Sequence, residues 1–197
     1  MLASCDIVPG GWSKIDADIT NVPPRPPEGP GHQTAFTTSR TAARWRESVR
    51  FARVLYVERK NLDTIRAGVK TLFGGTQNYA SVANPVLNDA RVTPDSMRAI
   101  PYVAGATAIT NSFGGAVTVV PVALGGGTNN GFRVTYPKVP GAVCAKLVTG
   151  AGTGWDQITV GTNVVKTFGT GSLNIANLAT ECAADAGSGI DIIFDSL

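Results

Sequence analysis

The clearest periodic pattern in the chain lies between residues 41 and 73. Four apolar residues follow one another there at steps of three, four and three positions: Leu62, Ile65, Val69 and Leu72. This spacing places them on one face of an α-helix, while the charged residues fall on the other faces. The glycine pair at 74–75 is typical of a helix end. The pattern therefore predicts one long amphipathic helix, over about residues 41–73, that packs this stripe against a sheet.

From Ile109 onward the pattern changes to the alternation that is typical of β-strands. Residues 116–124 are rich in β-branched side chains and are interrupted by Pro121, which predicts an edge strand or a bulge. The turn-forming run at 125–131 then leads into an alternating strand, so that a β-hairpin is predicted. A second hairpin is predicted over 156–166.

The remaining elements are expected to be short. Residues 81–100 hold two helical pieces, the second of which starts at the capping sequence of Thr93. Helices are also predicted over 143–149 and from a cap at Ser172 through Leu178, and a final strand over 190–194. These elements predict an α+β roll, in which a twisted antiparallel sheet packs on the long helix.

The first forty residues differ in composition from the rest. Six of the 12 prolines fall in the first thirty residues, which favours extended polyproline geometry without internal hydrogen bonds. We therefore expect residues 1–40 to be a poorly ordered leader and residues 41–197 to form a single globular head. The length of 197 residues suits one ordinary core with such a tail.

Basic residues are concentrated in the same part of the chain. Residues 1–60 hold nine Lys and Arg against six Asp and Glu, whereas residues 61–197 hold eight of each. Arginines at helical spacing from Arg40 to Lys60 are a candidate surface for nucleic acid or anionic lipid. Because Glu47 and Glu58 interrupt this run, we favour a solvated helix face over DNA binding.

The cysteines are three in number: Cys5, Cys144 and Cys182. No Cys-x-x-Cys pair exists and His32 is the only histidine, so a zinc site of the usual spacing cannot be assembled, and no cofactor is expected. The composition leaves two alternatives for the two cysteines of the body, namely inert buried thiols or a disulfide.

The chain offers little catalytic chemistry. A catalytic triad needs a histidine in a fixed geometry, and His32 lies between glycine and glutamine in the proline-rich leader. Four aspartates could supply paired carboxylates, but surface solubility is the favoured interpretation, since two of them lie on the polar face of the last strand: Asp156, Asp185, Asp191 and Asp195. The glycine-rich run at 125–131 leads into a strand and has no Gly-Lys-Ser/Thr, so it is a turn and not a phosphate loop. We expect no enzymatic activity and no catalytic residues.

Over about residues 55–197 the chain resembles the type IVb pilins, whose globular heads form the outer surface of bacterial type IV pili. The similar segments, in chain order, are residues 61–73 (NLDTIRAGVKTLF) with Gly75, Asn78 and Tyr79, residues 143–149 (VCAKLVT), residues 178–182 (LATEC) and the strand 190–194. Together they resemble a PilS-like major pilin whose soluble globular head lacks the hydrophobic half of the first helix.

The resemblance implies a Cys144–Cys182 disulfide that fastens the C-terminal region, in a protein matured where thiols oxidise. It also implies a structural subunit of an extracellular pilus, or fimbrium, that self-assembles into a helical filament. Its precursor would lie in the bacterial inner membrane, with the pilus assembly machinery. Adhesion to a host-cell receptor, aggregation and mating contact are the expected roles, and a minor or tip adhesin of the same fold is the alternative.

Residues 1–54 depart from the family pattern. They lack the apolar segment, the leader-peptidase context and the acid near the mature N-terminus that the family has. Two hypotheses account for this. In the first, which we favour, a vector-derived or otherwise foreign leader replaces the natural helix, and in the second the segment is a divergent native extension.

Overall fold

The computed structural model describes residues 37–76 and 78–197, with side chains from residue 49 onward. Its elements, in chain order, are α1 (Thr37–Phe73), α2 (Asn84–Asp89), the 3₁₀ helix η1 (Asp95–Met97), β1 (Thr118–Val122), β2 (Gly131–Val139), α3 (Gly141–Ala151), the 3₁₀ helix η2 (Gly152–Gly154), β3 (Gln157–Val160), β4 (Asn163–Lys166), α4 (Ile175–Ala183) and β5 (Ile190–Ser196). None of the helices in the described residues is long and apolar enough to cross a membrane.

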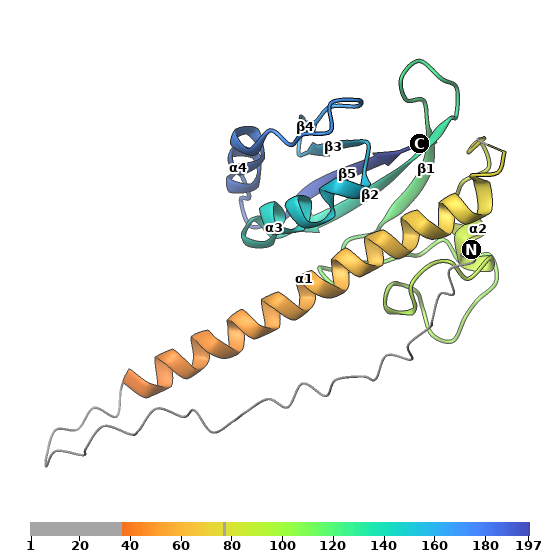
Figure 1. Cartoon of the computed structure of the whole chain (residues 1–197). Coiled ribbons are helices and arrows are strands. Elements are labelled where there is room, and N and C mark those ends of the chain that lie inside the picture. Colours follow the sequence, from red (N-terminus) through yellow and green to blue (C-terminus); the bar gives the residue numbers. More distant parts are fainter. Residues whose placement is uncertain (1–36, 77) are drawn as a thin grey trace, which may run out of the picture.

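The long helix α1 runs along one side of the sheet, and its first turns project beyond the head (Figure 1). It begins at Thr37, four residues before the predicted start. Leu62, Ile65 and Val69 are fully buried in the core. Burying side chains of this size stabilises the fold by about 1.5–3 kcal/mol each, relative to leaving them in water.

Leu72 is a correction to the predicted stripe. Its side chain is 42% exposed and contributes nothing to the contact between helix and sheet. Phe73 packs on the core instead, because the chain turns back after α1 and brings Tyr79 to a ring separation of 6.2 Å from Phe73. The buried stripe thus shifts by one residue, from Leu72 to Phe73, at the last turn of α1. The helix ends there, where Gly74 N–H donates to the Lys70 carbonyl at 2.8 Å.

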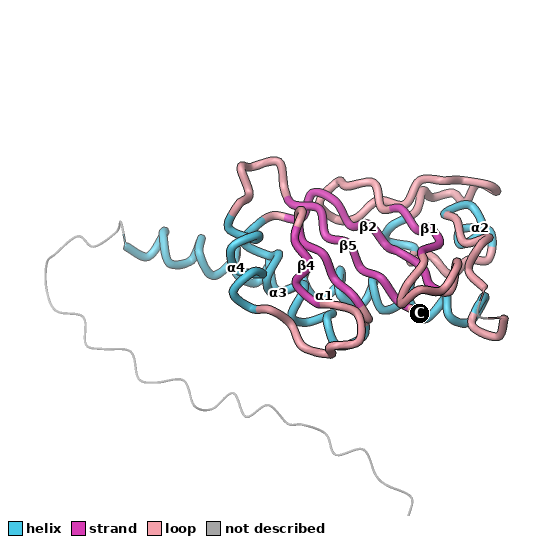
Figure 2. Tube along the Cα trace, turned by 90° about the horizontal axis from the view of Figure 1, so that it is seen from above, coloured by secondary structure: helices cyan, strands magenta, loops and turns pink. Residues whose placement is uncertain are grey.

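All five strands pair antiparallel in the order β1-β2-β5-β3-β4, and Figure 2 shows them as one layer in front of α1. Both predicted hairpins are present, since β1 pairs with β2 and β3 with β4. Pro121 lies in β1 at the sheet edge, as predicted, where its missing N–H costs no ladder bond. The last strand, β5, is the central strand of the sheet.

Two predicted helix starts differ from the structure. The segment after Thr93 forms only the single turn η1, and the Thr93 hydroxyl is buried without a partner among the described residues instead of capping a helix. Helix α4 is capped by Asn174 and not by Ser172, because the Asn174 side chain accepts a hydrogen bond from Asn177 N–H at 3.0 Å. More than one polar residue near each helix start could cap it, and tertiary packing determines which of them does.

Aromatic side chains join the helix side of the core to the sheet. Tyr79, Phe132, Trp155 and Phe194 form a row with ring centroids 5.4, 5.8 and 5.3 Å apart. Such offset and edge contacts add about 0.5–1.5 kcal/mol per pair beyond area burial. Because the row takes one ring from each of four segments, it ties β2 and β5 to the α1–α2 loop and to the loop before β3.

Asp195 is a second correction, since the alternation of β5 predicted it on the solvated face. The carboxylate is 1% exposed, and Arg133 of the neighbouring strand binds both of its oxygens, at 2.7 and 2.9 Å. The hydrogen bond with Asp195 raises the pKa of Arg133. Asp195 is therefore buried as an ion pair at one end of this face of β5, whereas Asp191 at the other end of the same face is exposed.

Replacing Arg133 with Leu should destabilise the head by about 2–4 kcal/mol, because it leaves the buried Asp195 carboxylate without its cation. Urea unfolding followed by circular dichroism measures this change. The matched double variant, Arg133→Leu with Asp195→Asn, should recover part of the loss. An Arg133→Leu protein as stable as the parent would show that the pair contributes no net stability.

Candidate functional site

The C-terminal third of the head is closed by a disulfide between α3 and α4. Cys144 and Cys182 are bonded, with their Cα atoms 5.6 Å apart, and both residues are buried. The bridge implied by the resemblance is therefore confirmed. The loop that it closes contains η2, β3 and β4, so it fixes the outer hairpin of the sheet and α4 relative to α3.

A buried lysine reinforces the same region. Lys166 lies at the end of β4, and its ammonium donates to the carbonyl oxygens of Gly152 at 2.8 Å and Trp155 at 2.6 Å. Gly152 caps the end of α3 and Trp155 caps the end of η2, and a helix C-terminus carries partial negative charge. The sequence pattern placed Lys166 at a strand end, but nothing in it indicated burial.

Asp185 holds the loop between α4 and β5 against the start of α3. Its carboxylate accepts hydrogen bonds from the backbone N–H groups of Gly141, Gly187 and Gly189, at 2.9, 2.8 and 3.0 Å. These three bonds, that from Gly141 first, lower the pKa of Asp185. The residue follows Cys182 closely, so a covalent and a polar clamp act at one place.

The two glycine-rich turns inside the disulfide loop, 150–154 and 161–171, differ in exposure. Residues 150–154 are not an exposed loop, because Gly152 is buried and Arg59 of α1 donates to the Gly150 carbonyl at 2.8 Å. A side chain at Gly150 would collide with the Arg59 guanidinium. By contrast, residues 161–171 are mostly exposed apart from Val165 and Lys166. Of the two turns, only the second is therefore a largely exposed surface.

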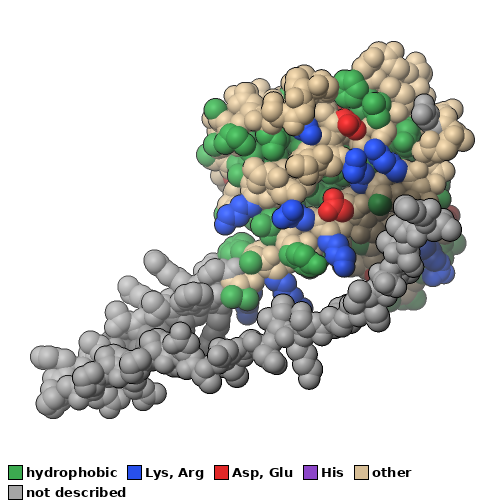
Figure 3. Space-filling model, in the orientation of Figure 1, with side chains coloured by type: hydrophobic (Ala, Val, Ile, Leu, Met, Phe, Trp, Pro, Cys, Tyr) green, Lys and Arg blue, Asp and Glu red, His purple; other side chains and the backbone are tan. Residues whose placement is uncertain are grey.

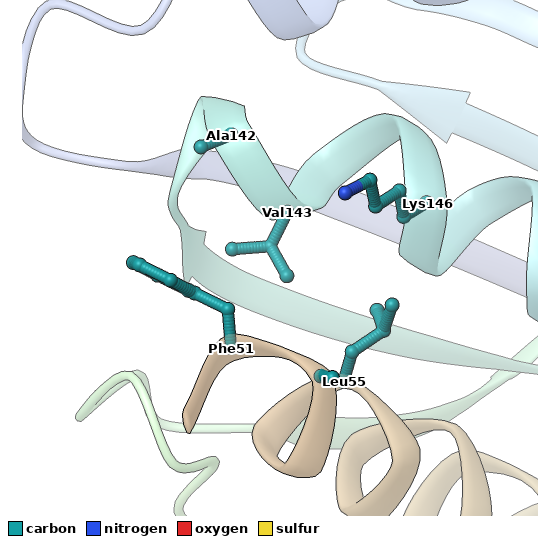
Figure 4. A pocket seen from close by; sticks show the side chains of 6 residues that line it. Phe51, Leu55, Ala142, Val143 and Lys146 are labelled. Carbon is teal, nitrogen blue, oxygen red and sulfur yellow. The ribbon is translucent and has the colours of Figure 1, made fainter. Parts of the chain in front are cut away.

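An apolar groove of about 320 Å³ separates the exposed part of α1 from α3 (Figure 4). Phe51 and Leu55 form the α1 wall, and Val143 and Lys146 form the α3 wall. Phe51 is 46% exposed, which is unusual for a phenylalanine of a packed helix. Of the basic run from Arg40 to Lys60, the side chains before residue 49 lie outside the described residues.

Glu58 is a buried acid that the sequence analysis placed on a solvated face. It is fully buried, and its Oε1 accepts a hydrogen bond from Ser112 N–H at 3.0 Å. It precedes Leu62 by four residues and therefore continues the buried stripe, which is the signal that could have revealed it. Through this bond α1 holds the loop before β1.

The candidate carboxylates are engaged in structural contacts. Asp156 accepts from the Ser196 hydroxyl and the Leu197 N–H at 2.8 and 2.9 Å, and Asp191 accepts from Lys138 N–H at 3.3 Å. Within the described part of the chain, no group of three or more metal-ligating side chains occurs. His32 and Cys5 lie outside the described residues.

A long helix packed on a five-stranded antiparallel sheet, with a disulfide closing the C-terminal region, is the α+β fold of the pilins. Residues 53–196 match the family described as PilS N terminal, so the chain belongs to the PilS family of type IVb pilins, which are structural proteins and not enzymes.

Solved structures agree with this assignment. The chain is similar to a type IV b pilin from Salmonella typhi, with 26% sequence identity and a TM-score of 0.55, over 70% of this chain and 96% of that chain. It also shares the fold of TcpA, a type IV pilin from the Vibrio cholerae El Tor biotype, with 18% identity and a TM-score of 0.54, over 74% of this chain and 99% of that chain. A comparison with curated proteins finds no match.

Removing the disulfide by replacing Cys144 and Cys182 with Ala should lower the free energy of unfolding by about 4 kcal/mol, because the bond closes a loop between residues 38 positions apart. Urea denaturation of both proteins tests this. Thiol titration of the denatured, unreduced parent should find one free thiol per chain, that of Cys5. Three free thiols would contradict the bridge.

Asp185→Ala should flatten the dependence of stability on acid pH. The pKa of Asp185 is lower in the folded state than in the unfolded chain, so the ionised side chain stabilises the fold. This stabilisation is fully present above the pKa of the unfolded chain and is lost as the pH falls towards the pKa of the folded state. An unperturbed aspartate titrates near pH 4, so the melting temperature of the parent should fall more steeply than that of the variant below about pH 4. Parallel curves would show that the clamp does not act in this way.

Proposed function

We propose that this chain is a structural subunit of a type IVb pilus, which self-assembles into the filament and mediates adhesion to host cells, aggregation or mating contact. The observation that carries the proposal is the match of residues 53–196 to the PilS family. The precursor lies in the bacterial inner membrane, where the pilus assembly machinery is its partner, and the mature subunit is displayed outside the cell in the pilus.

The physical role of the head is to be rigid and repeatable. The disulfide, the Asp185 clamp and the central position of β5 hold the C-terminal region in one arrangement, so every copy presents the same surface. Contacts between such heads in a helical filament are heterologous and do not close, so one subunit can be added indefinitely. The exposed segment 161–171 is the surface on which we expect contacts with a receptor.

Residues 49–197, joined behind the leader and hydrophobic first-helix half of the host's own major pilin in a pilus-assembling bacterium that lacks that pilin, should restore surface filaments in electron micrographs. Cys182→Ser should abolish these filaments, because an unclosed C-terminal region exposes apolar surface and strand edges. Thr180→Ser, an exposed position of α4 two residues before Cys182, is the matched control and should assemble as the parent does. Filaments as abundant with Cys182→Ser as with the parent would show that assembly does not require the disulfide.

Adherence of the same strains to cultured host cells, bacterial aggregation and mating frequency are then compared. A loss of filaments that changes none of the three would contradict the proposed contact role. Chains found only at filament tips by immunogold labelling would assign the protein as a tip adhesin instead of the major subunit.

A further inference from the structure

Three cations lie where α1 meets α3 and the turn after it, and Lys70 follows one helical turn further along α1; we call the four the basic seam: Arg59, Arg66, Lys70 and Lys146. Arg66 lies over the ring of Trp155, 5.9 Å from its centroid, and Arg59 is bound to Gly150, so both face α3 and the start of β3. Lys146 precedes Gly150 by one helical turn and is exposed on the same face of α3. Figure 3 shows Lys and Arg side chains gathered along α1 on this side of the head.

The charge of the basic seam is only weakly balanced. Asp63 is the exposed acid of α1 nearest to it in sequence, and the two ion pairs formed between described residues, Arg98 with Asp95 and Arg133 with Asp195, lie elsewhere. Burial, and then repulsion from Arg66, lower the pKa of Lys70, and Asp156, the acid that faces Lys70 from the loop before β3, opposes them only in part. The apolar groove at Phe51 adjoins the seam through Lys146, so apolar area and positive charge share one surface.

A hollow of opposite charge lies between α4, the β3–β4 turn and the start of β5. It has a volume of about 530 Å³, and its acidic residues are Glu181 and Asp191. The rest of the lining is mostly small, so a long basic side chain has room to enter: Gly161, Thr162, Ala184, Ser188 and Gly189. We call this surface the acidic hollow.

Both carboxylates of the acidic hollow keep an oxygen for a further partner. Glu181 Oε1 accepts from the Asn163 amide at 2.6 Å, and Asp191 Oδ1 accepts from the backbone of Lys138 at 3.3 Å. No hydrogen bond within the described residues uses Glu181 Oε2 or Asp191 Oδ2. The side chain of Lys138 is exposed and is the cation next to this surface.

We propose that the basic seam of one copy docks on the acidic hollow of a second copy, with Lys146 entering beside Glu181. The inference rests on the proposed function and names the contact by which the heads associate. The two surfaces are opposite in charge and share no residue, so the contact is heterologous and propagates along a filament. Complementary charge fixes partner choice and orientation, while burial of Phe51 in the same contact adds apolar area.

Charge reversal tests this contact in the same fusion of residues 49–197 to the host pilin's first-helix half, within the pilus-assembling bacterium. Lys146→Glu and Glu181→Lys should each reduce the number of filaments at least about tenfold, because each places like charges opposite one another. The combined variant, which carries both changes in every copy, should restore filaments because the pair is re-formed with its signs exchanged. Both side chains reach solvent, so the melting temperatures should stay close to that of the parent.

Matched controls use exposed charges away from both surfaces. Arg50 precedes Arg59 by nine residues, two and a half turns, and therefore lies on the opposite side of α1. Arg50→Glu and Asp95→Lys should assemble as the parent does. If Arg50→Glu also abolishes filaments, net charge and not the seam controls assembly, and the contact is refuted.

The other outcomes are equally decisive. If the parent assembles and neither single reversal affects the filaments, or if the combined variant does not recover, the two surfaces do not meet and only the contact is refuted. If Lys146→Glu weakens retention on immobilised DNA but leaves the filaments unchanged, the seam serves a nucleic acid instead. Absence of filaments from the parent would refute the subunit role itself.

Discussion

The last strand of the chain is the central strand of the sheet, and the rest of the head depends on this pairing. β5 binds β2 along one edge and β3 along the other, so without it the sheet would be two separate hairpins. Most contacts of β5 are with residues far away in the sequence, and closing such long loops costs entropy. The disulfide and Asp185, both just before β5, reduce that cost by holding its entry point against α3.

The few buried charges of the head also hold distant segments of the chain together. Arg133 and Asp195 join β2 to β5, Lys166 joins β4 to the turn after α3, and Glu58 joins α1 to the loop before β1. Each contact links segments that are distant in sequence, and each replaces solvent with a hydrogen-bonded partner, since a buried charge without one is costly. Apolar burial is non-directional, whereas these bonds specify which segments lie together.

Positive and negative side chains lie on different parts of the surface, and the net charge does not show this separation. The chain has a net charge of +3, yet the helix side carries a row of cations and the α4 side a pair of carboxylates. A head with two different surfaces of opposite sign suits repeated addition in one direction. The rigid C-terminal region keeps those surfaces at a constant distance from one another, which a repeating contact requires.

The periodic elements were predictable from the sequence alone. The stripe of Leu62, Ile65 and Val69, the two hairpins and the last strand follow from local periods of 3.6 and 2, which are properties of neighbouring residues. The pairing of Cys144 with Cys182 came from a family resemblance, because spacing alone does not say which thiols meet.

Only the tertiary structure decided which polar residues are buried and where the stripe ends. Alternation along β5 says that Asp195 faces away from Phe194, but not that Arg133 of β2 lies over Asp195 and buries it, while Asp191 on the same face stays exposed. Helical spacing likewise places Leu72 in line with Val69, yet the sheet no longer lies beneath it. A local period determines the face on which a side chain lies, whereas burial depends on which distant segment packs against that face, and no local pattern contains that information.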